Sequence, residues 1–409
     1  MTQPEPLIKM LMTAATEEFI SRFDRSPTLA ATAPGRINLI GEHTDYNDGF
    51  VLPIAIDQWA VAVGDILPDE TESQCTWCSF DLDEEFFVDY SQPLQAVQKP
   101  KWANYPLGVL DEFRQHQIEL PPMDFMLTSS IPIGAGLSSS AGVTVSLATL
   151  FAQSVGLDLD PLKKARWCRR AEHEFPKVPC GLMDPMISSL AVDGHALLVD
   201  CKTNEVKLIP MPSEDDAVLL VANTNVNRRL EESDYSIRKQ QCAEALQAIQ
   251  KDYNAEIQSL REVTTVDLKP LRDLMEPTLF KRVMHVVNEN VRTLESADAL
   301  LKNDLRRFGQ YLFASHLSLR DDYEVSCDEL DNLVELAGEF SEAVSGRDGG
   351  VFGARMTGGG FGGCVIVLCR PDSVDAVTEH LITGHRAKFD RSPTIFATRA
   401  VAGAHALEL

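Results

Sequence analysis

The chain has 409 residues, of which 44% are hydrophobic, so it is long enough to build two sizeable cores and two or three domains. Its formal net charge of −24 at pH 7 argues against a surface that binds nucleic acid or anionic membranes. No apolar run approaches the length needed to span a bilayer, so no membrane role is expected.

The first 23 residues are typical of an amphipathic helix and not of a signal peptide, because apolar residues recur at helical spacing with acidic residues between them. A cytoplasmic protein is therefore expected, and the nine cysteines fit that compartment as reduced residues. Cys75 and Cys78 have C-x-x-C spacing, but they lie in a strand-like stretch without a second pair, which disfavours a metal or redox role. The apolar positions of the helix are Leu7, Ile8, Leu11, Ala15 and Phe19.

Residues 33–49 form a turn-rich polar loop between apolar segments. Glu42, His43 and Asp45 can together donate to and accept from several neighbouring hydroxyls, and Arg36 adds a planar donor that is always charged. Glycines in the loop let the backbone approach a ligand closely. The pattern indicates a pocket for a small polyhydroxyl ligand, with a solvated surface loop as the alternative.

Residues 131–141 contain two glycines followed by three serines, between an expected strand at 124–128 and an expected helix at 142–155. Hydroxyls and unpaired N–H groups at a helix start, together with the helix dipole, form a cradle for phosphate. Neither a Walker sequence nor a complete dinucleotide fingerprint is present, since Ser139 occupies the place of the third glycine. An N-capped helix after a turn is the alternative.

A second glycine-rich segment spans residues 358–363 and formally satisfies G-x-G-x-x-G. Residues 365–369, which follow it, are typical of a buried strand and not of a helix, so the context is wrong for a Rossmann turn. Five glycines in six positions lose much conformational entropy on ordering. A close approach of this backbone to a ligand or to another segment is therefore expected.

Strands and helices are mixed irregularly along the chain, which predicts an α+β fold and not a doubly wound sheet. Pro210 and Pro212, with the polar residues after them, mark the best boundary between two lobes. The predicted domains are an N-terminal lobe at 1–212 and a C-terminal α+β lobe at 213–409. Further strands are expected at 60–66, 196–200 and 217–222 and near 395, and long charged helices at 232–251 and 280–302.

The three motifs, in this order, resemble those of the GHMP small-molecule kinases, and residues 35–49 are similar to the galactokinase signature in particular. The resemblance implies two α+β lobes with the active site between them. It places the galactose-binding signature and the phosphate cradle in the first lobe, with the third, glycine-rich motif of the second lobe beside the cradle. Other segments that resemble galactokinases are Cys180-Gly181-Leu182-Met183-Asp184, Asn223-Thr224-Asn225-Val226, Ser233-Asp234-Tyr235 and residues 315–323.

The resemblance also implies roles for individual residues. Asp184 would accept the proton of the sugar's anomeric hydroxyl, and Arg36 would stabilise charge on Asp184 and on the transferring phosphoryl group. Ser140 and Glu172 would hold Mg²⁺, because one hydroxyl and one carboxylate suffice when the nucleotide supplies further oxygens. Glu174 is a rival for Glu172, and His173 is expected to pack or orient, since magnesium prefers oxygen.

The expected sugar-binding residues are Glu42, His43, Thr44, Asp45, Gly181 and Tyr235. Trp102 would stack on the adenine of ATP, with a role as a helix anchor as its alternative. One departure from the family is that Pro185 follows Asp184, where galactokinases usually carry Gln. The expected ATP-binding residues are Gly134, Ala135, Gly136, Leu137, Ser138, Ser139, Ser140, Ser79 and Trp102.

The implied reaction is ATP-dependent phosphorylation of galactose to galactose 1-phosphate and ADP, by a monomer whose ligands are galactose and MgATP. A kinase for N-acetylgalactosamine is the alternative within the class, and Thr44 favours plain galactose over it. From a different class, a sensor could bind galactose and ATP without turnover. The intact serine-rich cradle disfavours that reading.

Overall fold

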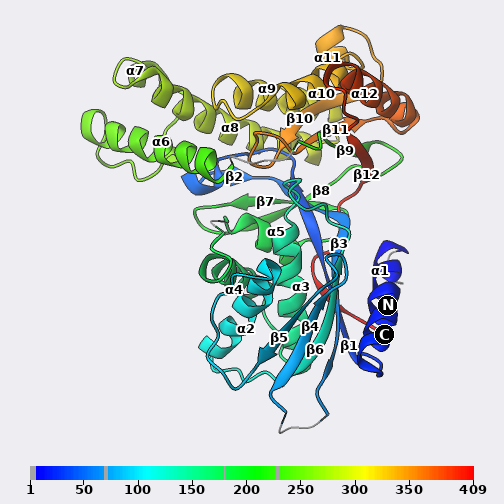
Figure 1. Ribbon diagram of the computed structural model, residues 1–409. Helices are drawn as coiled ribbons and strands as arrows, with labels where there is room; N and C mark the ends of the chain where they lie inside the picture. Colours follow the sequence, from blue (N-terminus) through cyan, green and yellow to red (C-terminus); the bar gives the residue numbers. More distant parts are fainter. Residues whose placement is uncertain (1–5, 69–71, 179, 227–230) are drawn as a thin grey trace.

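The computed structural model describes residues 6–68, 72–178, 180–226 and 231–409, which form two stacked lobes (Figure 1). The first lobe is built on a six-stranded sheet in the order β13-β1-β3-β6-β4-β5. Its neighbouring strands run antiparallel except β4 and β6, which are parallel. The strands are β1 (Leu29–Asn38), β3 (Pro53–Ile66), β4 (Gln74–Ser79), β5 (Glu84–Asp89), β6 (Met123–Ser129) and β13 (His405–Leu407).

Helices cover both faces of this sheet, which explains why nearly the whole of β1 is buried. On one face α1 packs against β3 and β6 through its apolar stripe, as expected for the part of the N-terminal helix from Pro6 onward; residues 1–5 lie outside the described chain. On the other face α3 packs against β1 and β3. The helices are α1 (Pro6–Phe23), α2 (Asn104–Gln115), α3 (Ser139–Ser154), α4 (Pro161–Glu174) and α5 (Met183–Leu190).

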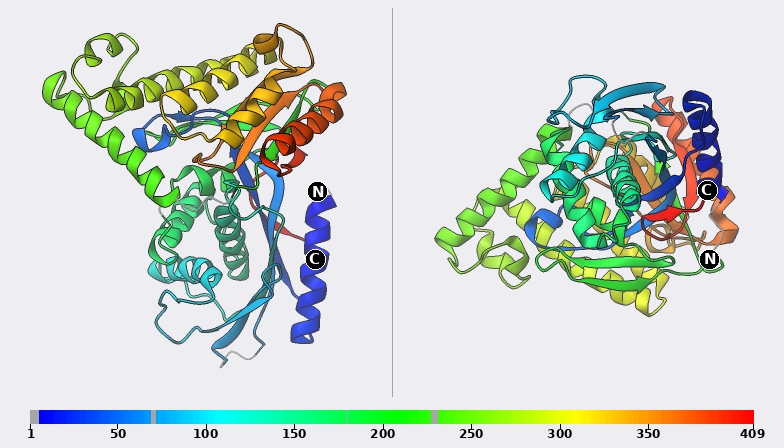
Figure 2. Two further views of the ribbon diagram at one scale, coloured as in Figure 1. Left: turned by 45° about the horizontal axis from the view of Figure 1, so that its top comes forward. Right: turned by 90° about the horizontal axis from the view of Figure 1, so that it is seen from below.

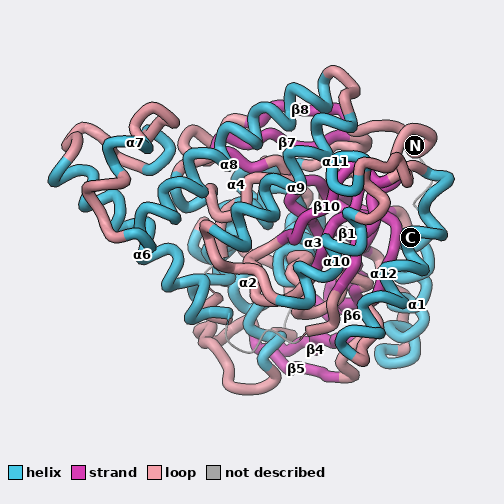
Figure 3. The backbone as a smooth tube through the Cα atoms, turned by 90° about the horizontal axis from the view of Figure 1, so that it is seen from above, coloured by secondary structure: helices cyan, strands magenta, loops and turns pink. Residues whose placement is uncertain are grey.

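The second lobe has a four-stranded antiparallel sheet in the order β10-β11-β9-β12, on which α9 and α10 pack (Figure 3). Helices α6 and α8 extend side by side away from this sheet (Figure 2). The strands are β9 (Val218–Asn223), β10 (Val351–Thr357), β11 (Cys364–Cys369) and β12 (Thr394–Thr398). The helices are α6 (Glu231–Asp252), α7 (Leu268–Leu271), α8 (Pro277–Leu301), α9 (Leu305–Asp321), α10 (Asp328–Gly338), α11 (Glu342–Ser345) and α12 (Val374–Phe389).

A small sheet and a shared core join the lobes. The small sheet is antiparallel, in the order β2-β7-β8, with β2 (Phe50–Val51), β7 (His195–Asp200) and β8 (Val206–Pro210). Apolar residues of both lobes, among them Ile37, Leu39, Val221, Phe308 and Ile366, pack into one buried cluster. The arrangement confirms the predicted α+β class.

The predicted boundary at 212/213 falls between β8 and β9, and it stays a prediction. The last strand, β13, returns to the first lobe and pairs with β1, an excursion that local sequence patterns did not indicate. Among the described residues, none of the helices is long and apolar enough to cross a membrane.

Candidate active site

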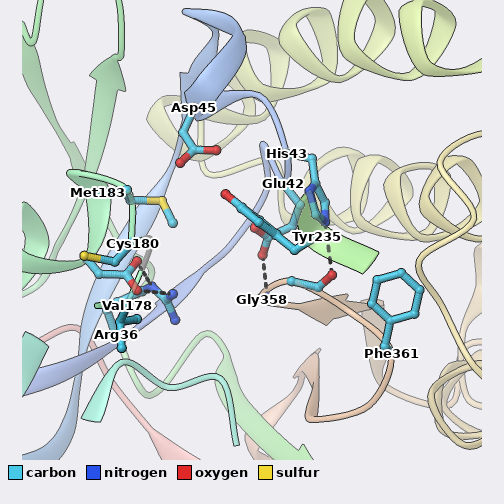
Figure 4. Close-up of a pocket in the computed structure, with 13 residues that line it drawn as sticks. Arg36, Glu42, His43, Asp45, Val178, Cys180, Met183, Tyr235, Gly358 and Phe361 are labelled. Carbon is cyan, nitrogen blue, oxygen red and sulfur yellow. Dashed lines mark hydrogen bonds and ion pairs between the residues drawn. The ribbon is translucent and has the colours of Figure 1, made fainter. Parts of the chain in front are cut away.

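A cavity of about 230 Å³ lies between the lobes, and it brings together residues that are far apart in the sequence (Figure 4). Strand β1, the loop after it, the start of α5, helix α6 and the glycine-rich segment after β10 all contribute walls. It includes both predicted catalytic residues and five of the six predicted sugar-binding residues. The lining residues are Arg36, Glu42, His43, Asp45, Val178, Cys180, Gly181, Met183, Asp184, Tyr235, Gly358, Gly359 and Phe361.

Arg36 and Asp184 form a bidentate ion pair in the wall of the cavity. Arg36 Nε donates to Asp184 Oδ1 at 2.8 Å, and Arg36 Nη2 donates to Asp184 Oδ2 at 2.7 Å. The remaining nitrogen, Nη1, donates to the carbonyl of Gly136 at 2.6 Å, so the guanidinium links the carboxylate to the phosphate cradle. This planar fork fixes the orientation of Asp184 more firmly than a point charge would.

The cradle lies against Arg36 because the backbone of β1 permits a close approach. The pairing register of β1 shifts between Pro34 and Gly35, and such irregularities re-aim the side chain that follows. A Cβ at Gly35 would lie 2.8 Å from the carbonyl oxygen of Leu137, which accepts a hydrogen bond from Arg36 N. Glycine at position 35 therefore lets the cradle pack directly on β1.

Ser138 is the N-cap residue of α3, but its side chain makes no capping hydrogen bond to that helix. Its hydroxyl instead donates to Asp184 Oδ2 at 2.6 Å, in a left-handed backbone conformation with φ 61°. The first-turn N–H groups of α3 are thus not bonded by this side chain, and they can receive a phosphate at the positive end of the helix dipole. The helix therefore has an N-cap residue, as the alternative expected, but the side chain of that residue bonds Asp184 and not the helix.

Asp184 is the second residue of α5 and not its N-cap, which is Leu182. Its carboxylate is held by Arg36 and Ser138. Pro185 is the third residue of the helix, and the first intrahelical bond runs from Met186 N to the Leu182 carbonyl. Pro185 still falls in the first turn, where an N–H group has no intrahelical partner.

Residues 41–50 are called the sugar loop below. Within this loop, the buried carboxylate of Glu42 forms hydrogen bonds with residues of both lobes. Its carboxylate accepts from Gly358 N at 2.7 Å, from Thr357 Oγ1 at 3.2 Å and from Asn38 Nδ2 at 3.1 Å. The buried guanidinium of Arg355 lies 3.6 Å away. The first and third motifs thus contact each other directly, as expected for a glycine-rich backbone that approaches another segment.

His43 faces the cavity from a left-handed backbone conformation, with φ 61°. Its Nε2 donates to the carbonyl of Gly359 at 3.1 Å, and its Nδ1 lies 2.8 Å from the hydroxyl of Tyr46. Burial, with the positive field of His285 and nearby arginines, lowers the pKa of His43 to about 3. The ring is therefore neutral at physiological pH and acts by hydrogen bonding.

Asp45 and Gly181 meet across the cavity wall. A Cβ at Gly181 would lie 2.6 Å from Asp45 Oδ2, so a larger residue would displace that carboxylate. Burial, together with the charges of Asp184 and Glu42, raises the pKa of Asp45 to about 6. Above that pH the carboxylate is ionised and can accept from sugar hydroxyls.

Thr44, the sixth predicted sugar-binding residue, does not line the cavity. It is fully buried, and its hydroxyl lies 2.8 Å from the carbonyl of Gly41 and 2.7 Å from that of Phe50. Thr44 therefore stabilises the conformation of the sugar loop through its own carbonyl groups, without facing the cavity. Tyr235, by contrast, borders the cavity with its ring 5.5 Å from that of His43.

The Ser140 hydroxyl lies within hydrogen-bonding reach of the Glu172 carboxylate. Glu172 is fully buried and accepts from Thr144 Oγ1 at 3.3 Å through Oε1, while none of the described residues forms a hydrogen bond with its Oε2. Burial raises the pKa of Glu172 to about 7, a hydrogen bond from Ser140 opposes that rise, and the nearby charge of Asp184 adds to it. An unpaired buried carboxylate oxygen beside a hydroxyl fits Mg²⁺, which prefers hard oxygen ligands.

The next two residues of α4, His173 and Glu174, bond other groups than the Ser140–Glu172 site. Glu174 is exposed and pairs with Lys177, so it does not compete for the metal position in this geometry. His173 Nε2 donates to the carbonyl of Cys180 at 2.8 Å, the orienting role expected for it. This contact supports the segment that carries Gly181 into the cavity.

We expect Ser140→Ala and Glu172→Gln each to raise the magnesium concentration for half-maximal activity at least about tenfold, since even indirect supports of a metal site cost that much. The measurement is ADP release against magnesium at fixed ATP. Glu174→Gln is the matched control, because its side chain is exposed on the same helix. A shift in the Glu174 variant, without one in the Glu172 variant, would reverse the assignment.

The predicted ATP residues occupy two places in the first lobe. Gly134 and Gly136 both adopt φ +74° in the turn before α3, and Cys364 Sγ lies 3.3 Å from the carbonyl of Ala135, which ties the third motif to the cradle. Ser79 ends β4. Trp102 is buried in the core of the first lobe, and its indole nitrogen has no hydrogen-bond partner among the described residues. Neither lines the cavity, and their contact with ATP stays a prediction.

Several cavity and support residues were missed from the sequence. Val178, Met183 and Phe361 line the cavity. Met183 and Phe361 lie within segments that the sequence singled out, but no role was assigned to them. Asn38 and Thr357 hold Glu42 from the two lobes, and nothing in the local sequence distinguishes them from ordinary buried polar residues.

Comparison with known proteins agrees with this geometry. Residues 17–65 match the galactokinase galactose-binding signature, residues 104–191 the N-terminal domain of GHMP kinases, and residues 296–385 the C-terminal domain of GHMP kinases. A crystal structure of a Methanococcus jannaschii mevalonate kinase shares the fold, with a TM-score of 0.62, 17% identity, and coverage of 92% of this chain and 99% of that one. The fold and the site define a small-molecule kinase of the GHMP class.

Relatives with higher sequence identity show to which family within this class the chain belongs. The chain is 41% identical to a galactokinase of Bos taurus and 40% identical to one of Homo sapiens, over 98% of this chain and of each relative. It also matches the crystal structure of Lactococcus lactis galactokinase complexed with galactose, with a TM-score of 0.89, 30% identity, and coverage of 97% of this chain and 100% of that one. The chain belongs to the galactokinase family, which confirms the resemblance and the predicted fold.

Proposed function

We propose that this protein transfers the γ-phosphoryl group of ATP to the anomeric hydroxyl of α-D-galactose, giving galactose 1-phosphate and ADP. The observation that carries the proposal is the Arg36–Asp184 pair in the wall of a cavity that is otherwise lined by the sugar loop. The cavity supplies several hydrogen-bonding groups, which suits a small polyhydroxyl substrate. The solved relative complexed with galactose supports the choice of sugar.

The proposed chemistry uses few groups, because phosphoryl transfer depends mainly on positioning and charge stabilisation. Asp184 accepts the proton of the anomeric hydroxyl as the oxygen attacks the γ-phosphorus. Arg36 holds Asp184 in one orientation and offsets the negative charge near the transferring group. Glu42, His43, Asp45 and Tyr235 orient the sugar so that its anomeric hydroxyl faces Asp184.

The cradle at residues 134–140 and the start of α3 would receive the phosphates of ATP. Ser140 and Glu172 would hold Mg²⁺, which offsets phosphate charge when bound. The direct bond from Ser138 to Asp184 would place the proton acceptor next to the phosphate site.

The test is ADP release with galactose, N-acetylgalactosamine and other sugars at saturating MgATP. The proposal expects galactose to give the highest kcat/KM. A preference for N-acetylgalactosamine would move the protein to the alternative within the class. Binding of galactose and ATP without any ADP release would identify a sensor.

Pro185 offers a direct test of the sensor alternative. Proline lacks the amide side chain of the usual glutamine, but it sits in the first helical turn without disturbing the fold, and Arg36 and Ser138 hold the base. We expect the natural protein to be active and Pro185→Gln to change turnover within about tenfold, equivalent to about 1.4 kcal/mol in the barrier. If the natural protein bound galactose and ATP without releasing ADP, while Pro185→Gln released ADP, the natural protein would be a sensor and not an enzyme.

We also propose that the enzyme works in the cytoplasm as a monomer. All nine cysteines lie in the described part of the chain and no disulfide bond joins any two of them, which agrees with a reducing compartment. Sedimentation of the purified protein, with and without MgATP and galactose, tests the oligomeric state.

A further inference from the structure

Helix α8 lies beside the sugar loop (Figure 1). Polar residues on this part of the helix are buried. Glu289 Oε1 accepts from the backbone N–H of Gly41 at 3.1 Å, and His285 Nε2 donates to the carbonyl of Glu42 at 3.1 Å. Asn290 Oδ1 accepts from Phe50 N at 2.9 Å. Three side chains from one face of a second-lobe helix therefore bond the backbone at both ends of the loop that forms the sugar-binding wall.

Glu289 is the charged member of this set, and its surroundings keep it ionised. Burial alone would raise the pKa of Glu289, but Arg292, His285 and Arg355 outweigh it and hold the pKa at about 2. Oε2 accepts from Arg292 Nε at 2.7 Å, and Ser315 Oγ donates to Oε1 at 2.6 Å. An ionised acceptor binds a backbone N–H more strongly than a neutral one does.

Gly41, whose N–H donates to Glu289, lies where the backbone has little conformational freedom. Gly41 adopts φ +100°, and a Cβ there would lie 2.4 Å from the carbonyl oxygen of Phe50. The next two residues, Glu42 and His43, line the cavity. A shift of Gly41 would therefore be passed directly to two side chains that face the sugar.

We propose that Glu289 is a positioning residue that sets the conformation of the sugar loop and thereby the affinity for galactose. The inference rests on the galactose activity proposed above. Glu289 does not line the cavity, so it acts through Gly41 and not by touching substrate. A preorganised loop loses less entropy when the ligand binds, and a displaced one lowers affinity without altering the groups that perform the transfer. Within the described chain, the hydrogen bonds of the Glu289 carboxylate go to Gly41, Arg292 and Ser315, and none goes to the phosphate cradle or to the Arg36–Asp184 pair.

The main test variant is Glu289→Asp, which keeps the charge beside Arg292 but draws the carboxylate back from Gly41 by one methylene. We expect the KM for galactose to rise about tenfold or more, with kcat and the KM for ATP changed less than about threefold, since lost ground-state binding appears in KM. In parallel, galactose should raise the melting temperature of the variant less than that of the natural protein, while MgATP raises both equally. Asp298→Asn, an exposed change on the same helix, is the control and should alter neither constant.

Ser315→Ala is the second variant, because it removes a hydroxyl that donates to the same oxygen while Arg292 and the Gly41 N–H still bond the carboxylate. It should also raise the KM for galactose selectively, by about threefold, as expected for loss of one hydrogen bond that orients a positioned group. Equal changes in both KM values, or an unchanged galactose KM in whichever of the two variants folds, would overturn the proposal. If the natural protein releases no ADP with galactose, the proposed function fails, and the galactose-induced change in melting temperature still decides the role of Glu289.

Discussion

Asp184→Asn is expected to lose at least about 100-fold in turnover, equivalent to about 2.7 kcal/mol in the barrier. The carboxylate accepts two N–H bonds from Arg36 and one hydroxyl bond from Ser138. An amide at this position cannot take the proton of the anomeric hydroxyl, and its NH₂ group would face either the guanidinium or the Ser138 hydroxyl. Galactose-dependent ADP release at saturating MgATP measures the loss.

Binding should survive better than catalysis in this variant, because Glu42, His43, Asp45 and Tyr235 still line the cavity. A galactose-induced rise in melting temperature checks this point and shows that the protein is folded. Asp83→Asn, a change at an exposed carboxylate paired with Arg22, is the matched control. Near-normal turnover of the folded Asp184 variant would remove Asp184 from the role of proton acceptor.

The secondary structure was largely predictable because it depends on local patterns. The expected strand at 196–200 lies within β7, and the expected helices at 232–251 and 280–302 correspond to α6 and α8. The expected strand at 365–369 is β11, so the glycine-rich segment before it is not a Rossmann turn. Apolar residues that alternate or recur at helical spacing carry this information in the sequence itself.

The contacts that hold the site together were not predictable in the same way. Glu42 bonds to Gly358 and Thr357, which are more than 300 residues further along the chain, and Glu289 bonds to Gly41 from α8. No local pattern encodes such pairs, because they depend on how the lobes pack. For the same reason the sequence placed Thr44 in the sugar site, although its hydroxyl is used by the loop's own carbonyls.

The choice between Glu172 and Glu174 as the metal ligand needed more information than the periodicity of the sequence contains. Residues two apart on a helix do not face the same way, so only one of the two can point toward Ser140. Periodicity alone left both open, and the resemblance favoured Glu172. Glu172 is completely buried and one of its oxygens has no partner among the residues that the structure describes, which agrees with that choice, whereas Glu174 is exposed beside Lys177.

Arg36→Ala is expected to lose about 10²–10³-fold in turnover, the range for removal of one preorganised donor from a site where charge develops. Arg36→Lys should also be impaired, to a smaller extent. The ammonium group keeps the charge, but it cannot bond both oxygens of Asp184 and the Gly136 carbonyl in one plane. The loss in Arg36→Lys therefore measures the geometry of the fork, and the further loss in Arg36→Ala measures the charge.

The matched control for both Arg36 variants is Arg25→Lys. Arg25 also bonds two carboxylates in the first lobe, Asp65 and Asp124, but it lies outside the cavity lining. Its replacement should affect stability at most, because it loses similar hydrogen bonds without changing the groups around the substrate. ADP release and melting temperature, measured for all three variants, separate the two effects. If Arg36→Lys matched the natural protein in kcat, the fork would not be needed, and Asp184 would be held in place by Ser138 and the start of α5 alone.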